Sequence, residues 1–173
     1  MPDATCQLEH SIDVDVSPDF AWSWRTEIKN WDDPPAQFQL EGPFGAGSWG
    51  STIVPGQAPL RWQIRDVRPG EAFTIAMPLD DALISFEWMF EAVSSHRTRI
   101  TQRIWLSGNN APAYVDQVQA GFGATLADGM KRIADAMQSH YRGIESRSLR
   151  GMRLRPAADD HSGLNTEFQR GPQ

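Results

Sequence analysis

The feature that most constrains the fold is the order of segments along the chain. A short, Trp-containing helical stretch near the start is followed by a long run of strand-like segments and then by one long amphipathic helix. The opening segment reads LEHSIDVDVSPDFAWSWRTEIKNW, and the closing helix reads PAYVDQVQAGFGATLADGMKRIADAM. A sheet with one apolar face needs a covering layer, and the final helix can supply it. We therefore predict a sheet wrapped around a helix, with an apolar cavity between them.

The first elements are predicted to be a half-buried strand and a short helix. Apolar side chains alternate with polar or acidic ones from Leu8 to Val16, which is the period of a strand. Ser17 and Pro18 then provide an N-cap and a proline at the first helical position. Because the Asp32–Pro35 run cannot continue a helix, we expect the helical part to be short and broken.

The middle of the chain, from Gln37 to Leu106, is predicted to form consecutive antiparallel strands. The apolar alternation is interrupted at turns rich in glycine or proline, such as 42–47 and 68–70. Each strand has one apolar face, which suits a sheet that is covered on one side. Glu87 and Arg99 fall on the opposite faces of their strands, where we expect cross-strand ion pairs and no catalytic role.

The covering helix is predicted to run from Pro112 to about Tyr141. Its apolar residues advance in steps of three or four and form a continuous stripe: Val115, Val118, Phe122, Leu126, Met130, Ile133 and Met137. Gly121, Gly123 and Gly129 oppose a helix, since each interior glycine costs roughly 1 kcal/mol relative to alanine. We expect these glycines to allow close approach to the sheet or to leave room beside a ligand.

Composition narrows the functional classes. A chain of 173 residues fits one domain, and the net charge of −6 argues against nucleic-acid binding. The single cysteine, Cys6, allows no internal disulfide and no thiolate metal cluster. The start lacks the pattern of a signal peptide and no segment approaches a membrane span, so we expect a cytoplasmic protein. A homodimer is compatible with the sequence.

The end of the chain differs in composition from the rest. Residues 142–173 contain six arginines and four acidic residues, so this segment is locally basic in an acidic chain. We predict a helix-grip ligand-binding domain over residues 1–141 and a flexible, polar, basic tail over residues 142–173, to which no function is assigned.

Several motifs resemble those of the START and Bet v 1-like superfamily, which includes polyketide cyclases and dehydrases. The resemblance lies in the strand-to-helix start, the tryptophan at the helix end, the glycine hairpin, the turn before the central strand and the last two strands: Ser17–Trp22, Trp31–Asp32, Gly45–Gly50, Arg68–Phe73, Phe86–Glu91 and Thr98–Thr101. It implies an α+β helix-grip fold, in which a curved antiparallel sheet of about seven strands grips the C-terminal helix. The turn Ser94–Arg97 departs from the family pattern, so we expect a differently shaped hairpin there.

The inward faces of the predicted elements nominate residues that line the cavity and contact a ligand. They are Phe38, Leu40, Trp62, Ile64, Phe73, Ile75, Phe86, Trp88, Ile100, Ile104, Val118, Phe122, Leu126 and Met130. For any one of them the competing interpretation is a filled core, because protein interiors pack at crystal-like density. The tryptophans of the strand region favour a cavity, since large flat side chains commonly line ligand pockets.

Three polar residues are candidates for acid–base or orienting roles in this cavity. His10 lies on the apolar face of the first strand, and an imidazole suits proton transfer near neutral pH. Gln102 shares a face with Ile100 and Ile104 and could bind a carbonyl or hydroxyl group. Tyr114 stands at the start of the long helix. The competing interpretation for each is a structural group that is hydrogen-bonded within the core.

Cofactor and metal signatures are absent from the sequence pattern. The glycines at 45, 47 and 50 lie between strands and do not open a helix, so a dinucleotide site is not expected. The four histidines show no metal-ligand spacing, and we expect neither a metal nor a cofactor.

Two functions of different classes fit the sequence. One is a carrier that binds a small hydrophobic molecule, such as an aromatic, polyketide-like or lipid molecule, without changing it. The other is a cyclase or dehydratase that acts on such a molecule through His10, Gln102 or Tyr114. A third, weaker alternative is a protein-interaction module like the chaperone-activator relatives of the same fold.

Overall fold

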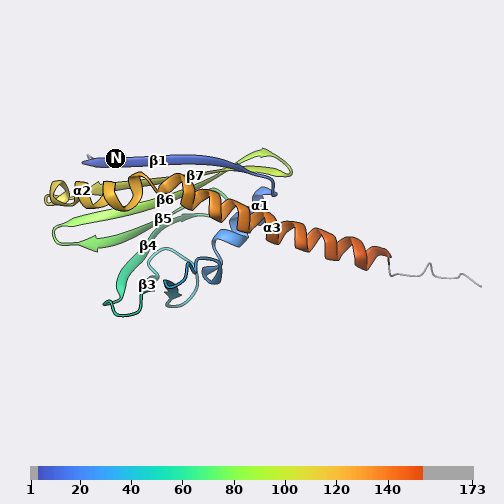
Figure 1. Cartoon of the computed structure of the whole chain (residues 1–173), viewed down its shortest axis with the longest axis horizontal. Coiled ribbons are helices and arrows are strands. Elements are labelled where there is room, and N and C mark those ends of the chain that lie inside the picture. The colour runs from blue at the N-terminus through green and yellow to red at the C-terminus, as the bar shows by residue number, and fades with distance from the viewer. Residues whose placement is uncertain (1–3, 154–173) are drawn as a thin grey trace, which may run out of the picture.

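The computed structural model describes residues 4–153 and shows a curved sheet gripping a long C-terminal helix (Figure 1). The α+β helix-grip fold predicted from the sequence is therefore confirmed. The strands are β1 (Cys6–Val14), β2 (Gln37–Leu40), β3 (Trp49–Ile53), β4 (Leu60–Arg68), β5 (Ala72–Leu79), β6 (Ala82–Ser94) and β7 (Arg97–Ser107). The helical elements are α1 (Pro18–Arg25), η1 (Ile28–Asn30), η2 (Ala111–Tyr114), α2 (Val115–Val118), η3 (Gln119–Gly123) and α3 (Leu126–Arg153).

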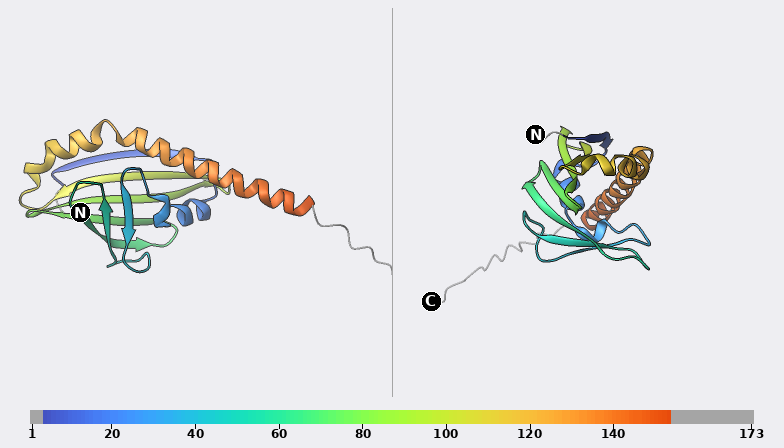
Figure 2. Two further views of the ribbon diagram at one scale, coloured as in Figure 1. Left: turned by 60° about the horizontal axis from the view of Figure 1, so that its bottom comes forward. Right: turned by 90° about the vertical axis from the view of Figure 1, so that its left-hand side faces the viewer.

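The sheet has the order β1-β7-β6-β5-β4-β3-β2, and all neighbouring strands are antiparallel. The first two strands in the sequence thus form the two edges, and α1 with η1 connects one edge to the other. Figure 2 shows the sheet curving around the space that α3 covers. A break in the β4–β5 register between Ile64 and Asp66 adds to the bend, because a bulge kinks its strand and increases the local twist.

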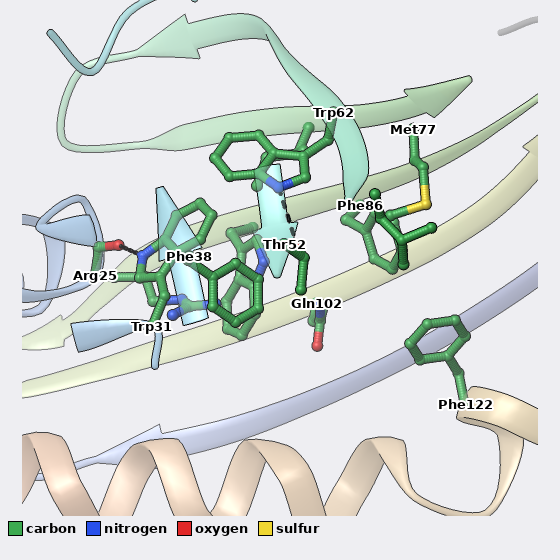
Figure 3. A pocket seen from close by; sticks show the side chains of 12 residues that line it. Arg25, Trp31, Phe38, Thr52, Trp62, Met77, Phe86, Gln102 and Phe122 are labelled. Carbon is green, nitrogen blue, oxygen red and sulfur yellow. Dashed lines mark hydrogen bonds between the residues drawn. The ribbon is translucent and has the colours of Figure 1, made fainter. Parts of the chain in front are cut away.

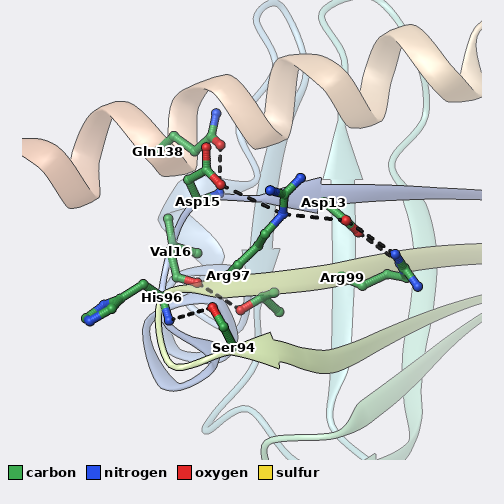
Figure 4. A network of polar contacts seen from close by, with 9 residues as sticks. Asp13, Asp15, Val16, Ser94, His96, Arg97, Arg99 and Gln138 are labelled. Atoms are coloured by element: carbon green, nitrogen blue, oxygen red, sulfur yellow. Dashed lines mark hydrogen bonds and ion pairs between the residues drawn. The ribbon is translucent and has the colours of Figure 1, made fainter.

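The predicted start of α1 is confirmed, and polar contacts fix it to the rest of the fold. The hydroxyl of Ser17 accepts a hydrogen bond from the backbone N–H of Phe20 at 3.3 Å. Figure 4 shows the surrounding network, in which the backbone N–H of Asp15 donates to the side-chain oxygen of Gln138 on α3 at 2.8 Å. The hydroxyl of Thr98 on β7 donates to the carbonyl of Val16 at 3.0 Å. The end of β1 is therefore held by both layers of the fold.

The hairpin between β6 and β7 closes tightly, with Ser94 opposite Arg97 after a register shift that follows Ala92. The backbone N–H of His96 donates to the hydroxyl of Ser94 at 3.2 Å, as Figure 4 shows. This short polar turn places Arg97 within 3.5 Å of the carboxylate of Asp13 on β1.

The predicted helix from Pro112 to Tyr141 is wrong in its continuity and in its end. The segment starts as η2 and α2, widens into the π-helical η3 that contains Gly121 and Gly123, and turns before α3 begins at Leu126. Glycine disfavours a regular helix because it loses more backbone freedom than other residues, and the hydroxyl of Thr125 donates to the carbonyl of Gly121 at 2.9 Å. α3 then continues to Arg153 and extends past the sheet (Figures 1 and 2). Residues 154–173 of the predicted tail lie outside the described residues.

The two faces of the sheet differ in polarity, as the alternation of apolar and polar residues predicted. The concave face carries the fully buried Ile64 and Phe73, and Met137 of α3 contributes to the same core. The convex face carries ion pairs across neighbouring strands: Arg99 with Asp13 at 2.8 Å, and Arg103 with Glu9 at 2.7 Å and with Glu87 at 3.1 Å. Glu87 and Arg99 each belong to such a cross-strand pair, as expected. No helix in residues 4–153 is long and apolar enough to cross a membrane.

Candidate ligand cavity

Two adjoining cavities lie between the concave face of the sheet and the helical layer. The first, here called the sheet cavity, has a volume of about 260 Å³, and the second, the helix cavity, of about 460 Å³. The helix cavity borders α3 through Leu126, Gly129 and Ala136. Six residues line both cavities and mark the place where they meet: Arg25, Trp31, Phe38, Trp88, Gln102 and Phe122.

The wall of the sheet cavity is almost entirely apolar, and aromatic rings form much of it. Strands β4, β5 and β6 contribute Trp62, Ile75 and Phe86, and Ile75 lies directly opposite Phe86 in the β5–β6 ladder, so that both side chains are on the inward face. The ring of Phe86 meets that of Phe122 edge to face at 5.5 Å, so the π-helical segment closes the cavity from the helical side. Figure 3 shows these side chains around the cavity.

The position of Trp62 depends on a glycine in the neighbouring strand. Gly50 lies opposite Trp62 in the β3–β4 ladder, and a Cβ atom at Gly50 would lie 2.2 Å from the indole ring. The indole N–H donates to the hydroxyl of Thr52 at 3.2 Å. The glycine hairpin thus lets the ring lie flat over β3 and form part of the cavity wall.

Trp31, which follows η1, is the centre of the aromatic cluster at the other end of the cavity. Its indole N–H donates to the backbone carbonyl of Arg25 at 2.6 Å. Its ring stacks on that of Phe73 at 6.1 Å and 15°, and lies 5.5 Å from that of Trp62. The tryptophan that follows the short helix is therefore a link between α1 and the cavity wall.

Arg25 is the charged group of this cavity, and it is buried. The residue is 7% exposed, and its guanidinium carbon lies 4.8 Å from the ring centre of Trp31 and 4.1 Å from that of Trp88. Among the described residues, its Nε atom is fully buried and has no hydrogen-bond partner. Burial lowers the pKa of Arg25 to about 9, so the guanidinium still carries its charge at neutral pH.

The energetics of Arg25 are unfavourable in the structure as it stands. Removing an isolated cation from water costs several kcal/mol even after relaxation. A desolvated cation–π contact returns about 2 kcal/mol. Two such contacts with Trp31 and Trp88 only partly offset the loss, and no carboxylate of the described residues lies within ion-pair distance of Arg25. Arg25 is therefore a buried cation without an anionic partner among the described residues.

The three polar candidates from the sequence are placed very differently. Gln102 lines both cavities. His10 lies opposite Gln102 in the β1–β7 ladder, but does not line either cavity. The hydroxyl of Tyr114 accepts a hydrogen bond from the backbone N–H of Asp80 at 3.2 Å, in the turn between β5 and β6. Their catalytic roles stay predictions, and only Gln102 is placed where it can contact a ligand.

The predicted ligand-contact residues divide into two groups. One group lines the cavities: Phe38, Trp62, Ile75, Phe86, Trp88, Phe122 and Leu126. The other belongs to the packed core and lines neither cavity: Ile64, Phe73, Ile100, Ile104, Val118 and Met130. Leu40 borders a separate hollow beside α1, together with Trp22, Ile28 and Phe44. For the core group the filled-core interpretation describes the packing, and ligand contact by the first group stays a prediction.

Sequence reasoning missed five residues that line the sheet cavity: Arg25, Trp31, Thr52, Leu60 and Met77. A signal for Arg25 was available, because it follows Ala21 by four residues and so shares the inward face of α1. Nothing local to the sequence says that a charged residue on that face stays buried. In residues 4–153, no cluster of three or more His, Cys, Asp or Glu side chains is arranged to hold a metal ion.

The comparisons with known proteins place these features in context. Residues 5–138 match the family described as polyketide cyclase / dehydrase and lipid transport. No curated protein matches the sequence.

Solved structures share the fold at low sequence identity. The Zhui aromatase/cyclase from Streptomyces sp. R1128 superposes with a TM-score of 0.61 at 13% identity, over 77% of this chain and 93% of that one. Norcoclaurine synthase from Thalictrum flavum, in complex with dopamine and hydroxybenzaldehyde, gives 0.60 at 17% identity, over 78% and 87%. Ara h 8.0201 gives 0.56 at 13% identity, over 80% and 98%. These similarities show a common helix-grip architecture.

Proposed function

The chain belongs to the polyketide cyclase / dehydrase and lipid transport family, and from this premise we propose that it binds a small hydrophobic, ring-bearing molecule between the sheet and α3. The observation that carries the proposal is the aromatic lining of the sheet cavity, to which Trp31, Phe38, Trp62, Phe86 and Trp88 all contribute. Apolar pockets with a few polar groups are typical small-molecule sites. Norcoclaurine synthase, which shares the fold, holds two aromatic molecules in its own structure.

Binding without conversion is the primary form of this proposal. Of the three candidate acid–base residues, His10 and Tyr114 stand away from the cavity lining, and Gln102 has no ionisable group. A carrier needs only the cavity and a way to orient the ligand.

A cyclase-type reaction is the second candidate, and Arg25 is the observation that favours it. A cation beside the ligand can polarise a carbonyl group of the ligand and stabilise negative charge that develops on its oxygen. The aromatase/cyclase with the same fold gives this alternative a precedent in architecture.

The test begins with native mass spectrometry of the protein purified from its own host, followed by release and identification of any bound molecule. The released molecule is then titrated into the recombinant protein while tryptophan fluorescence is followed, since Trp31, Trp62 and Trp88 line the cavity. We expect a stoichiometric hydrophobic ligand that quenches or shifts the emission. Absence of a bound molecule, together with no thermal shift across an aromatic and lipid panel, would argue against the proposal.

Two phenylalanine variants make the test specific to the cavity. Phe122→Ala removes a ring from both cavities, whereas Phe44→Ala removes a ring that lines neither. Both side chains are half-buried, so the pair is matched in chemistry and exposure. Binding should weaken in the first variant and be retained in the second. Analysis of the molecule after incubation separates the two functions, because a carrier returns it unchanged and an enzyme converts it.

The cytoplasmic location, the possible homodimer and the division into residues 1–141 and 142–173 stay predictions from the sequence. Size-exclusion chromatography with light scattering measures the molar mass in solution and so tests whether the protein is a homodimer.

A further inference from the structure

We propose that the molecule bound in this cavity carries a carboxylate beside its apolar ring system, and that the carboxylate pairs with the guanidinium of Arg25. This inference rests on the proposed binding function and narrows it from hydrophobic molecules in general to aromatic or alicyclic carboxylic acids. It goes beyond the family, whose description names no charged group.

The first support is the state of Arg25 itself. Its Nε atom is buried without a hydrogen-bond partner among the described residues, and the residue lines both cavities. The rings of Trp31 and Trp88 attract the positive charge, but they offer no oxygen atom to the N–H donors. A guanidinium is a planar fork of donors that matches the geometry of a carboxylate. The missing partner therefore has a defined charge and shape.

The second support is that the nearby carboxylates are engaged elsewhere. Asp32 and Asp33 are the acidic residues that line the helix cavity. A side-chain oxygen of Asp32 accepts a hydrogen bond from the backbone N–H of Phe38 at 3.0 Å. Asp33 pairs with Arg132 at 3.6 Å, and both side chains are largely exposed. Neither acid lies within ion-pair distance of Arg25. The guanidinium can therefore pair with an anion supplied by a ligand.

The third support is the neighbouring amide of Gln102. This residue lies opposite Trp88 in the β6–β7 ladder, and the Trp88 ring contacts the guanidinium of Arg25. Gln102 lines both cavities. Its N–H₂ group is a donor on the same cavity, and it suits an oxygen of the ligand close to the one held by Arg25.

The two ends of the cavity also differ in polarity. Figure 3 shows Arg25 and Trp31 at one side and Met77 and Phe86 at the other, with Gln102 between them. A polar end next to an apolar chamber of about 260 Å³ fits a molecule with one anionic group and one compact apolar body. The bound carboxylate would lie at the junction of the two cavities, and the ring system in the sheet cavity.

The experiment compares two probes of the same ring system and nearly the same size, the anionic naphthalene-2-carboxylate and the neutral naphthalene-2-carboxamide, by isothermal titration calorimetry with the full chain. We expect the carboxylate to bind at least about tenfold more tightly, as charge-assisted hydrogen bonds exceed neutral ones. Equal binding of the two probes would overturn the carboxylate inference and leave the proposed hydrophobic-ligand function standing. Binding of neither probe would overturn the inference and count against the proposed function as well.

Two variants locate the effect at Arg25. Arg25→Met keeps an unbranched apolar side chain and removes the guanidinium with its charge, and it should abolish the preference for the carboxylate while the carboxamide still binds. Arg132→Gln is the control, because Arg132 also lines the helix cavity but is exposed and paired with Asp33. A preference that persists in Arg25→Met or disappears in Arg132→Gln would refute the assignment.

A measurement on the unmodified protein covers the case in which Arg25→Met does not fold. The Nε–H resonance of Arg25, observed by NMR with ¹⁵N-labelled arginine, should shift downfield on addition of the carboxylate and not of the carboxamide. An unchanged resonance at saturating carboxylate would show that the anion binds elsewhere.

Discussion

His10 on β1 lies directly opposite Gln102 on β7, yet only Gln102 lines the ligand cavities. The two residues are side by side in one row of the sheet and share its concave face. Alternation along the strands identifies that face, but the limits of the cavity depend on what α3 covers, and α3 packs closely against β1. His10 therefore lies outside the cavity because its strand, β1, is at the edge of the sheet and is covered by α3.

We predict that His10→Ala changes the affinity for a cavity ligand by less than about twofold, whereas Gln102→Leu weakens it by about fivefold. The glutamine variant removes one neutral hydrogen bond to the ligand at nearly constant volume, and such bonds are worth about 1 kcal/mol. Fluorescence titration with naphthalene-2-carboxylate measures both. A larger loss in His10→Ala than in Gln102→Leu would reverse the assignment and support an active role for His10.

We predict that Arg25→Met raises the stability of the ligand-free protein. The variant removes a buried cation without an anionic partner, and replacement of buried charges by apolar groups is often stabilising by about 1–4 kcal/mol. The lost contacts with Trp31 and Trp88 reduce the gain, so we expect about 1 kcal/mol. Urea unfolding measures it, with Arg132→Gln as the exposed control. A clear loss of stability would mean that the two cation–π contacts outweigh desolvation.

The difference in stability between Arg25→Met and the wild type should depend on pH. Burial lowers the pKa of Arg25 to about 9, well below the ordinary value that the exposed side chain has in the unfolded chain. Below pH 9 the group is charged in both states and the folded protein bears the full penalty. Above pH 9 the folded protein releases the proton first, so the unfolded chain binds more protons and the wild type gains stability. The advantage of Arg25→Met should therefore shrink between pH 8 and pH 10, as measured by urea unfolding at both values. A constant difference would contradict the lowered pKa.

We predict that Gly50→Ala lowers stability by about 1–3 kcal/mol, because overpacking displaces the ring of Trp62. The added Cβ would lie 2.2 Å from that ring. Gly45→Ala is the matched control in the same hairpin, since nothing lies within 4 Å of a Cβ there. Thermal unfolding and tryptophan emission report the two effects. Equal behaviour of the two variants would show that Trp62 can move at little cost.

We predict that Gly129→Leu and Gly143→Leu both strengthen α3 by about 0.5–1 kcal/mol, because each replaces a glycine by a good helix former. Neither position has an atom within 4 Å of an added Cβ. Only Gly129 borders the helix cavity, so only its variant should lower the affinity for a ligand. Thermal shift and fluorescence titration separate the two effects. Equal affinity in both variants would exclude the helix cavity from ligand binding.

The sequence predicted the architecture well because the architecture follows from local signals. The Ser17–Pro18 start of α1 and the strand alternation each depend on neighbouring residues, and both are confirmed. The convex ion pairs of Glu87 and Arg99 follow from the same alternation.

The cavity could be predicted only in part, because its limits depend on contacts between distant segments. Alternation alone cannot separate Trp62, which lines the sheet cavity, from Ile64, which is two residues further along the same face and fully packed. Arg25 is covered by the ring of Trp88, a residue that is distant from it in the sequence. The π-helical break at Gly121 and Gly123 interrupts a stripe that continues through it in sequence. These features are set by tertiary packing.

The position of β1 at the edge of the sheet has a consequence for how the cavity is assembled. β1 pairs only with β7, so that Leu8 meets Ile104, and α1 follows β1 directly. Contacts of such long sequence separation form slowly, because the loop between them must close first. On the ribosome, the first strand and the helix that carries Arg25 must therefore wait until β7 has been synthesised. The meander from β2 to β7 can pair strand by strand as it emerges, whereas the end of the cavity that contains Arg25 cannot be completed before β7.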